Sequence, residues 1–267
     1  MDDDRIRVDL QQGVADVRLV RADKMNALDD AMFEALRRTG ERLKSTPGLR
    51  AVVLSGEGRA FCAGLDTANF GKMASGERGG ARLLEGERTP GGANPPQHTV
   101  MVWRELPVPV IAAVHGVAYG GGFQLMLAAD LRFMAADTRL SIMEINWGLV
   151  PDMGGMALLH RLVRDDVARE LTYTGRVFSG EEAHRLGLAT RLSADPHADA
   201  LALAREIAAR PPKAMRAAKR LLDLAPQADA KEILLAESRE QAALIGAPEQ
   251  VEAVTARLQK RPAVFQD

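Results

Sequence analysis

Two acidic residues within an otherwise apolar stretch are the clearest sign of chemistry in this chain. The segment SIMEINWGLVPDMGG, residues 141–155, surrounds Glu144 and Asp152 with apolar side chains and glycines. Apolar surroundings favour the neutral form of a carboxyl group, which raises its pKa and suits it to proton transfer. We therefore interpret Glu144 as an acid/base. For Asp152 two interpretations stay open, catalysis or the N-cap of a helix that begins near Met153.

A run of three glycines suggests where such chemistry takes place. Residues 109–130 read PVIAAVHGVAYGGGFQLMLAAD, which predicts a strand, a turn over Gly120 to Gly122 and a helix over 123–129. Glycine lets backbone N–H groups approach a ligand, and the start of a helix favours negative charge. The spacing fits neither a P-loop nor a dinucleotide fingerprint. A site for a negatively charged oxygen and a tight junction that only glycine can pack both remain open.

The elements that must position these residues follow from hydrophobic patterns. Alternation over 6–10 and 14–20 predicts a hairpin, and Asp29 can cap a helix that runs to about residue 44. A strand over 50–55 and a helix over 98–105 follow. The order of helix, strand and glycine turn then recurs. These patterns predict an α/β fold with repeated ββα-like units.

Composition divides the chain into two parts. Residues 1–198 form the expected core, with a mobile loop rich in Gly, Arg and Glu over 71–97. Residues 199–267 form the expected helical region, with helices over 201–209, 213–224, 230–245 and 248–260. The helix over 230–245 has more apolar surface than a lone hairpin can cover. We expect it to pack on a neighbouring subunit or on the core.

Overall composition excludes several classes of partner. The chain has 267 residues, 46% of them hydrophobic, and a net charge of −1, which argues against nucleic acid or an anionic membrane. No apolar run reaches the length of a membrane span, and the acidic N-terminus has no apolar signal region. The single Cys62 excludes an internal disulfide, and the five histidines form no H-x-x-x-H pair. We expect a metal-free cytoplasmic protein.

Five segments, taken together, resemble a known family. KMNALD at 24–29, AFCAGLD at 60–66, PVIAAVHGVAYGGG at 109–122, EINWGLVPDMGG at 144–155 and QKRPAVF at 259–265 occur in that order. They resemble the motifs of the enoyl-CoA hydratase/isomerase, or crotonase, superfamily. The resemblance covers nearly the whole chain.

The resemblance implies a crotonase-like spiral of ββα repeats, with C-terminal helices that build homotrimers, often paired into hexamers. It implies an acyl-CoA thioester substrate, with coenzyme A as part of the substrate and no separate cofactor. By resemblance, the backbone N–H groups of Leu65 and Gly121 form an oxyanion hole for the thioester oxygen. The positions that match the CoA-binding residues of the family are Lys24, Ala27, Ala63 and Asp66.

The chain departs from the hydratase pattern at one position. Family hydratases carry a glutamate two residues after the glycines and a second one twenty residues later; here Gln124 holds the first position and Glu144 the second. A lone glutamate at this second position resembles the 3,2-enoyl-CoA isomerases. Asp152 lies where dienoyl-CoA isomerases have an aspartate. We favour isomerisation by Glu144 over hydration by Glu144 with Asp152, in which the Gln124 amide positions water.

Other interpretations remain. Loss of the first glutamate also fits a non-catalytic acyl-CoA-binding scaffold. An RNA-binding relative is disfavoured because the stretch 213–220 is the one notable basic cluster in a near-neutral chain. We expect Trp147 and Trp103 to be wall or core residues, and Cys62 to be a small buried packing residue.

Overall fold

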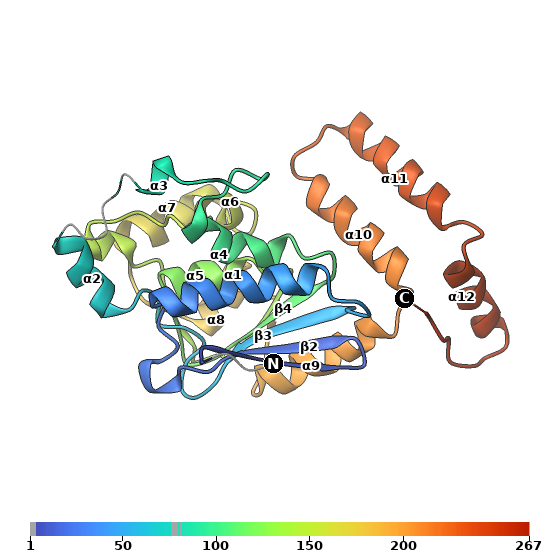
Figure 1. Cartoon of the computed structure of the whole chain (residues 1–267), viewed down its shortest axis with the longest axis horizontal. Helices are drawn as coiled ribbons and strands as arrows, with labels where there is room; N and C mark the ends of the chain where they lie inside the picture. The colour runs from blue at the N-terminus through green and yellow to red at the C-terminus, as the bar shows by residue number, and fades with distance from the viewer. Residues whose placement is uncertain (1–3, 76–79, 81, 267) are drawn as a thin grey trace.

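A six-stranded sheet lies at the centre of the molecule (Figure 1). The computed structural model describes residues 4–75, 80 and 82–266. The strands of this sheet, in spatial order, are β1 (Ile6–Gln11), β2 (Val14–Leu19), β3 (Ala51–Gly56), β4 (Val110–Val114), β6 (Leu131–Met134) and β9 (Arg191–Leu192). The first two pair antiparallel, as the alternation predicts, and the other neighbours pair parallel.

A second, smaller sheet completes each repeat. Its strands, in order, are β5 (Val117–Tyr119), β7 (Arg139–Ser141) and β8 (Phe178–Ser179). Strand β4 leads to β5 and then to helix α5 (Gly121–Leu127), and β6 leads in the same way to β7. After β3, a single bridge between Cys62 and Ala118 stands in place of the short strand. The expected α/β spiral of ββα units is confirmed.

Helices cover both faces of the large sheet because the buried side chains of its strands alternate. On one face, Val52 and Leu54 pack with α1 (Asp30–Lys44), α4 (Pro95–Arg104) and α5. On the other face, Ala51 and Val53 pack with α9 (Pro196–Ala208), which Figure 1 shows below the sheet. Helix α9 therefore packs with the sheet, although most of it falls within the region 199–267 that the sequence assigns to separate helices.

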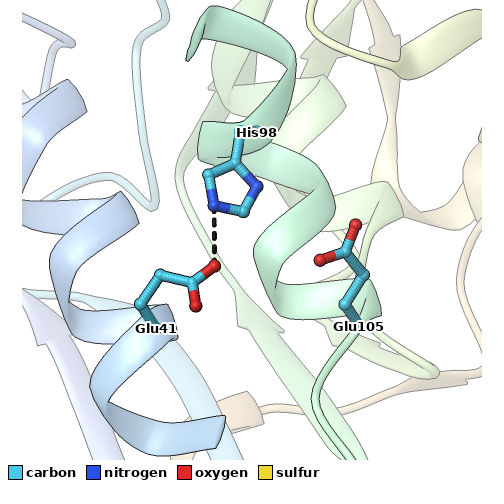
Figure 2. Close-up of side chains that lie close together, drawn as sticks. All are labelled: Glu41, His98 and Glu105. Carbon is cyan, nitrogen blue, oxygen red and sulfur yellow. Dashed lines mark ion pairs between the residues drawn. The ribbon is translucent and has the colours of Figure 1, made fainter. Parts of the chain in front are cut away.

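An ion-pair network joins α1 to α4. In Figure 2, His98 on α4 faces Glu41 on α1, with 2.7 Å between His98 Nε2 and Glu41 Oε1, and Glu105 lies beside them. The Lys44 ammonium lies 2.9 Å from Glu41 Oε1 and 2.7 Å from Glu105 Oε2. Because this cation already compensates both carboxylates, we interpret the cluster as structural. His98 contacts Glu41 here and does not line the cavity described below.

The prediction of one continuous loop over 71–97 is wrong. Helix α2 (Thr67–Ala74) extends into this range, α3 (Arg82–Glu85) lies within it, and α4 begins at Pro95 instead of residue 98. Asn94 accepts from the Gln97 N–H and the Gln97 side chain accepts from the Asn94 N–H, so the two form a capping box. The prolines that suggest a loop occupy the first turn of a helix, where proline is favoured. Residues 76–79 and 81 lie outside the described part of the chain.

Helices α10 (Pro212–Leu224), α11 (Ala230–Leu244) and α12 (Pro248–Leu258) stand apart from the body in Figure 1. Helix α10 is tied to the core through buried Lys219, whose Nζ lies 2.6 Å from Asp130 Oδ2. None of the described residues of α11 is buried, and Leu234 and Leu235 are exposed. The core of this chain therefore leaves the apolar surface of α11 uncovered.

Short helices complete the fold. They are η1 (Ala22–Lys24), η2 (Glu144–Trp147), α6 (Gly155–Leu159), α7 (Asp165–Thr174) and α8 (Gly180–Leu186). Within the described ranges, no helix combines the length and apolar character needed to cross a bilayer.

Candidate active site

A cavity of about 700 Å³ brings together all of the residues that the sequence singles out for chemistry or CoA binding. Those residues are Glu144, Asp152, Gln124, Leu65, Gly121, Lys24, Ala27, Ala63 and Asp66. They come from the η1 segment, the loop before α2, the start of α5, η2 and the segment before α6. The fold thus assembles one site from five separate parts of the chain, and the role of each residue remains a prediction.

The glycine corner brings two backbone segments into direct contact. Gly64 has a φ of +86°, and a Cβ at Gly64 would lie 2.5 Å from the Tyr119 carbonyl oxygen and 3.5 Å from the Gly121 nitrogen. A Cβ at Gly122 would lie 2.3 Å from the carbonyl oxygen of Cys62. Both positions therefore require glycine, because any side chain would push the two segments apart. The tight-junction interpretation is correct for Gly122 and is compatible with an oxygen site.

The two expected oxyanion donors are the backbone N–H groups of Leu65 and Gly121. Leu28 donates to the Gly64 carbonyl at 2.8 Å and accepts from the Asp66 N–H at 3.1 Å, so Leu65 lies opposite Leu28 in a parallel bridge. The N–H of Leu65 consequently points away from Leu28. Gly121 is the first residue of α5, where a helix has no internal acceptor for the N–H. Within the described residues, neither N–H has a hydrogen-bond acceptor.

Two segments expected to hold CoA lie side by side. Asn26 Nδ2 donates to the Ala60 carbonyl at 2.8 Å, and Cys62 Sγ lies 3.1 Å from the Asn26 carbonyl. Arg21 donates to Asp66 Oδ2 at 2.5 Å and to the Ala27 carbonyl at 3.0 Å. The sequence analysis missed Arg21, although an arginine just before KMNALD is a natural partner for the acid of AFCAGLD. Cys62 is buried, and burial raises its pKa to about 12, which confirms a packing role.

The Asp66 side chain has a structural role. Its Oδ1 accepts from the Ala68 N–H at 2.9 Å and thereby caps α2. With its other oxygen paired to Arg21, this carboxylate is committed to the protein. A contact from this position to CoA would therefore involve the backbone of Asp66.

Gln124 fixes the orientation of Glu144. The Gln124 amide oxygen accepts from the Met153 N–H at 2.9 Å and from the Gly155 N–H at 3.0 Å. Both lone pairs of that oxygen are therefore in use, and the amide nitrogen must point the other way. It donates to Glu144 Oε1 at 2.6 Å. Glu144 Oε2 is buried and has no hydrogen-bond partner among the described residues.

Burial raises the pKa of Glu144 above its usual value, and the nearby charge of Asp152 adds to this effect. Hydrogen bonds from its own backbone N–H and from Gln124 act in the opposite direction, because they favour the ionised form. A carboxyl group with a raised pKa in a cavity is suited to taking and returning a proton. The raised pKa agrees with the expectation drawn from the apolar surroundings of Glu144, and its acid/base role stays a prediction.

Asp152 is not a helix cap. Helix α6 begins at Gly155 with Gly154 as its N-cap. The interpretation of Asp152 as the N-cap of a helix that begins near Met153 is therefore wrong. Asp152 is exposed, lines the cavity, and lies close enough to Glu144 to raise its pKa. Its position is compatible with a contribution to chemistry.

An aromatic pair forms part of the cavity wall. Trp147 stacks on Phe70 with ring centroids 4.4 Å apart and an interplanar angle of 24°. Trp147 is thus a wall residue as expected, and Trp103 is fully buried in the core. The sequence analysis missed Phe70. A signal was present, because Phe70 and Met73 have the i, i+3 spacing that places two side chains on one face of a helix.

Comparisons with known proteins agree with this geometry. A family model described as enoyl-CoA hydratase/isomerase matches residues 9–267. Mouse mitochondrial methylglutaconyl-CoA hydratase is 31% identical over 258 residues, which cover 94% of this chain and 79% of that protein. Mouse mitochondrial Delta(3,5)-Delta(2,4)-dienoyl-CoA isomerase is 32% identical over 215 residues, which cover 78% of this chain and 65% of that protein. The structure of an enoyl-CoA hydratase from Bacillus anthracis superposes with a TM-score of 0.88 at 29% identity, covering 98% of each chain.

Proposed function

Because the chain belongs to the enoyl-CoA hydratase/isomerase family, we propose that it shifts the double bond of a 3-enoyl-CoA to the 2-position with Glu144 as its single acid/base. The fold is the crotonase fold, and the family is one of acyl-CoA enzymes. The choice among family reactions rests on the site of this chain. The observation that carries it is the orientation of the Gln124 amide.

The proposed reaction moves one proton. Ionised Glu144 removes a proton from the α-carbon, and the electrons of that C–H bond delocalise through the double bond onto the thioester oxygen. The N–H groups of Leu65 and Gly121 donate to this oxygen, and such donors each stabilise the transition state by about 3 kcal/mol. Protonated Glu144 then delivers the proton to the γ-carbon, so that the double bond becomes conjugated with the thioester.

Gln124 supports this reaction over two-carboxylate hydration. To add water across a double bond, a second group must take a proton from water or return one to carbon. An amide has no pKa in the required range, and the Gln124 oxygen already accepts from two backbone N–H groups. Gln124 can therefore only orient Glu144 and stabilise its charged form. We interpret it as a positioning residue.

Hydration by Glu144 with Asp152 is the second candidate. The observation that favours it is that Asp152 lines the same cavity as Glu144, where its charge contributes to the raised pKa of Glu144. In that mechanism Asp152 would handle the proton that the family's first glutamate handles. A non-catalytic scaffold is disfavoured, because the raised pKa of Glu144 and two unused N–H donors are features of a working site.

Two substitutions distinguish these candidates. On trans-3-hexenoyl-CoA, Glu144→Gln should abolish formation of the conjugated product, while Asp152→Asn should retain most of it. The same variants, assayed on crotonyl-CoA, control for hydration. Loss of turnover in both variants would refute the single-base mechanism and favour the carboxylate pair.

We also propose that the C-terminal helices assemble the chain into a homotrimer or a hexamer. Leu234 and Leu235 on α11 are 62% and 48% exposed, and Ile245, directly after this helix, is 67% exposed. Together they form a large exposed apolar surface. A neighbouring copy would cover it. Sedimentation of the purified protein tests this, and the cytoplasmic location expected from the sequence stays a prediction.

A further inference from the structure

We propose that the acyl group accepted by this site is a neutral hydrocarbon chain that packs against the stacked pair of Phe70 and Trp147. This inference rests on the proposed function, because it names the substrate class of the same site. It also assigns specificity to two residues that the reaction itself does not require.

The pair lines the same cavity as both reacting groups. Phe70 lies in α2, whose N-cap Asp66 directly follows Leu65. Trp147 lies in η2, three residues after Glu144. Their rings stack across the two segments, with centroids 4.4 Å apart. A thioester oxygen at the Leu65 N–H and an α-carbon at Glu144 would therefore leave the rest of the acyl chain next to these rings.

The exposure of Trp147 indicates that its surface is available to a ligand. The residue is 54% exposed although it lines a cavity, and tryptophan is normally among the more buried residue types. Further apolar side chains line the same cavity, namely Met73, Leu83, Leu149 and Val150. Each methylene that such a wall removes from water gains about 0.8 kcal/mol, which is about fourfold in affinity.

The charges in the cavity disfavour an acyl group with a second carboxylate. Glu144 and Asp152 both line the cavity, so its reacting end already holds two acidic groups. Among the described lining residues Lys24 is the one cation, and it is exposed in the η1 segment. A carboxylate on the acyl chain would lose water and meet like charges without a partner.

Binding of saturated acyl-CoAs tests the inference without turnover. Butyryl-, hexanoyl-, octanoyl- and glutaryl-CoA are titrated into the protein by calorimetry. Kd should fall about fourfold per methylene from butyryl to octanoyl, and glutaryl-CoA should bind more than tenfold more weakly than hexanoyl-CoA. A Kd that does not change with chain length, or equal binding of glutaryl- and hexanoyl-CoA, would overturn the proposal.

Variants locate the effect. Trp147→Ala and, independently, Phe70→Ala should flatten the dependence of Kd on chain length. Trp147→Phe should restore most of the dependence, because it keeps an aromatic ring. Tyr173→Ala is the matched control, since Tyr173 is 65% exposed on α7 and does not line the cavity. If Trp147→Ala and Phe70→Ala both keep the full dependence, the pair is not the acyl wall.

Saturated thioesters have no double bond to shift or hydrate, so these titrations are independent of the proposed reaction. Chain-length dependence without turnover on any enoyl-CoA would support the acyl class and refute the reaction. Isomerase activity together with a Kd that does not change with chain length would support the reaction and refute the proposed acyl class.

Discussion

Replacing Gln124 by methionine separates its hydrogen bonds from its volume. Methionine has nearly the same length but offers no strong donor or acceptor, so Gln124→Met removes the 2.6 Å bond to Glu144 Oε1. A hydrogen bond to a charged group contributes about 1.5–3 kcal/mol. Because this bond favours the ionised form of Glu144, losing it should raise the pKa of Glu144 further.

The assay is the pH dependence of kcat/KM on a 3-enoyl-CoA. The proposed reaction needs ionised Glu144, so activity falls as pH drops through its pKa, and in Gln124→Met this fall should occur at a higher pH than in wild type. The variant also leaves the buried N–H groups of Met153 and Gly155 without an acceptor, at about 1–3 kcal/mol of stability each. A folded variant whose acidic limb stays at the wild-type pH would refute the role assigned to Gln124.

Three further changes test the account of charge. Glu144→Gln should unfold at the same or a higher temperature than wild type at neutral pH. Burial raises the pKa of this carboxyl, so the folded state favours its protonated form, and its ionisation costs stability at neutral pH but not at low pH. A large loss of stability at neutral pH would contradict this. Asp152→Asn should move the acidic limb to lower pH, because a like charge near Glu144 is removed; an unchanged limb would show that the two do not interact. Lys219→Met should lower the free energy of unfolding by about 1.5–3 kcal/mol in urea titrations, since it removes the bonds of the buried ammonium to Asp130 and to the Val108 carbonyl, while Arg104 still pairs with Asp130. The control Lys213→Met, on the same helix, removes a longer 3.7 Å pair made by an exposed ammonium and should have a smaller effect, because the Lys213 backbone N–H still donates to Glu249.

Local signals were sufficient for much of the fold. Asp29 caps α1 through the Met32 N–H at 2.8 Å, as an aspartate before an amphipathic run predicts. The hairpin of β1 and β2 and the strand–glycine–helix unit around Gly121 also follow from short patterns. The prediction of a loop over 71–97 failed because this range is rich in Gly and Pro, although Asn94 and the prolines after it start a helix.

The site depended on contacts that no local pattern contains. The orientation of the Gln124 amide is set by two N–H groups that follow it by 29 and 31 residues. The contact of Phe70 with Trp147 joins two separate segments of the fold. Residue types at spaced positions indicated which groups could act. Only the packing showed that Gln124 serves Glu144 and that Asp152 does not cap a helix.

The most direct test of the central claim assays the purified protein on trans-3-hexenoyl-CoA and on crotonyl-CoA under the same conditions. A single-base isomerase should produce conjugated enoyl absorbance from the first substrate and consume none from the second. Loss of enoyl absorbance from crotonyl-CoA, at a rate equal to or above any isomerisation, would contradict the claim and show that Glu144 and Asp152 together add water.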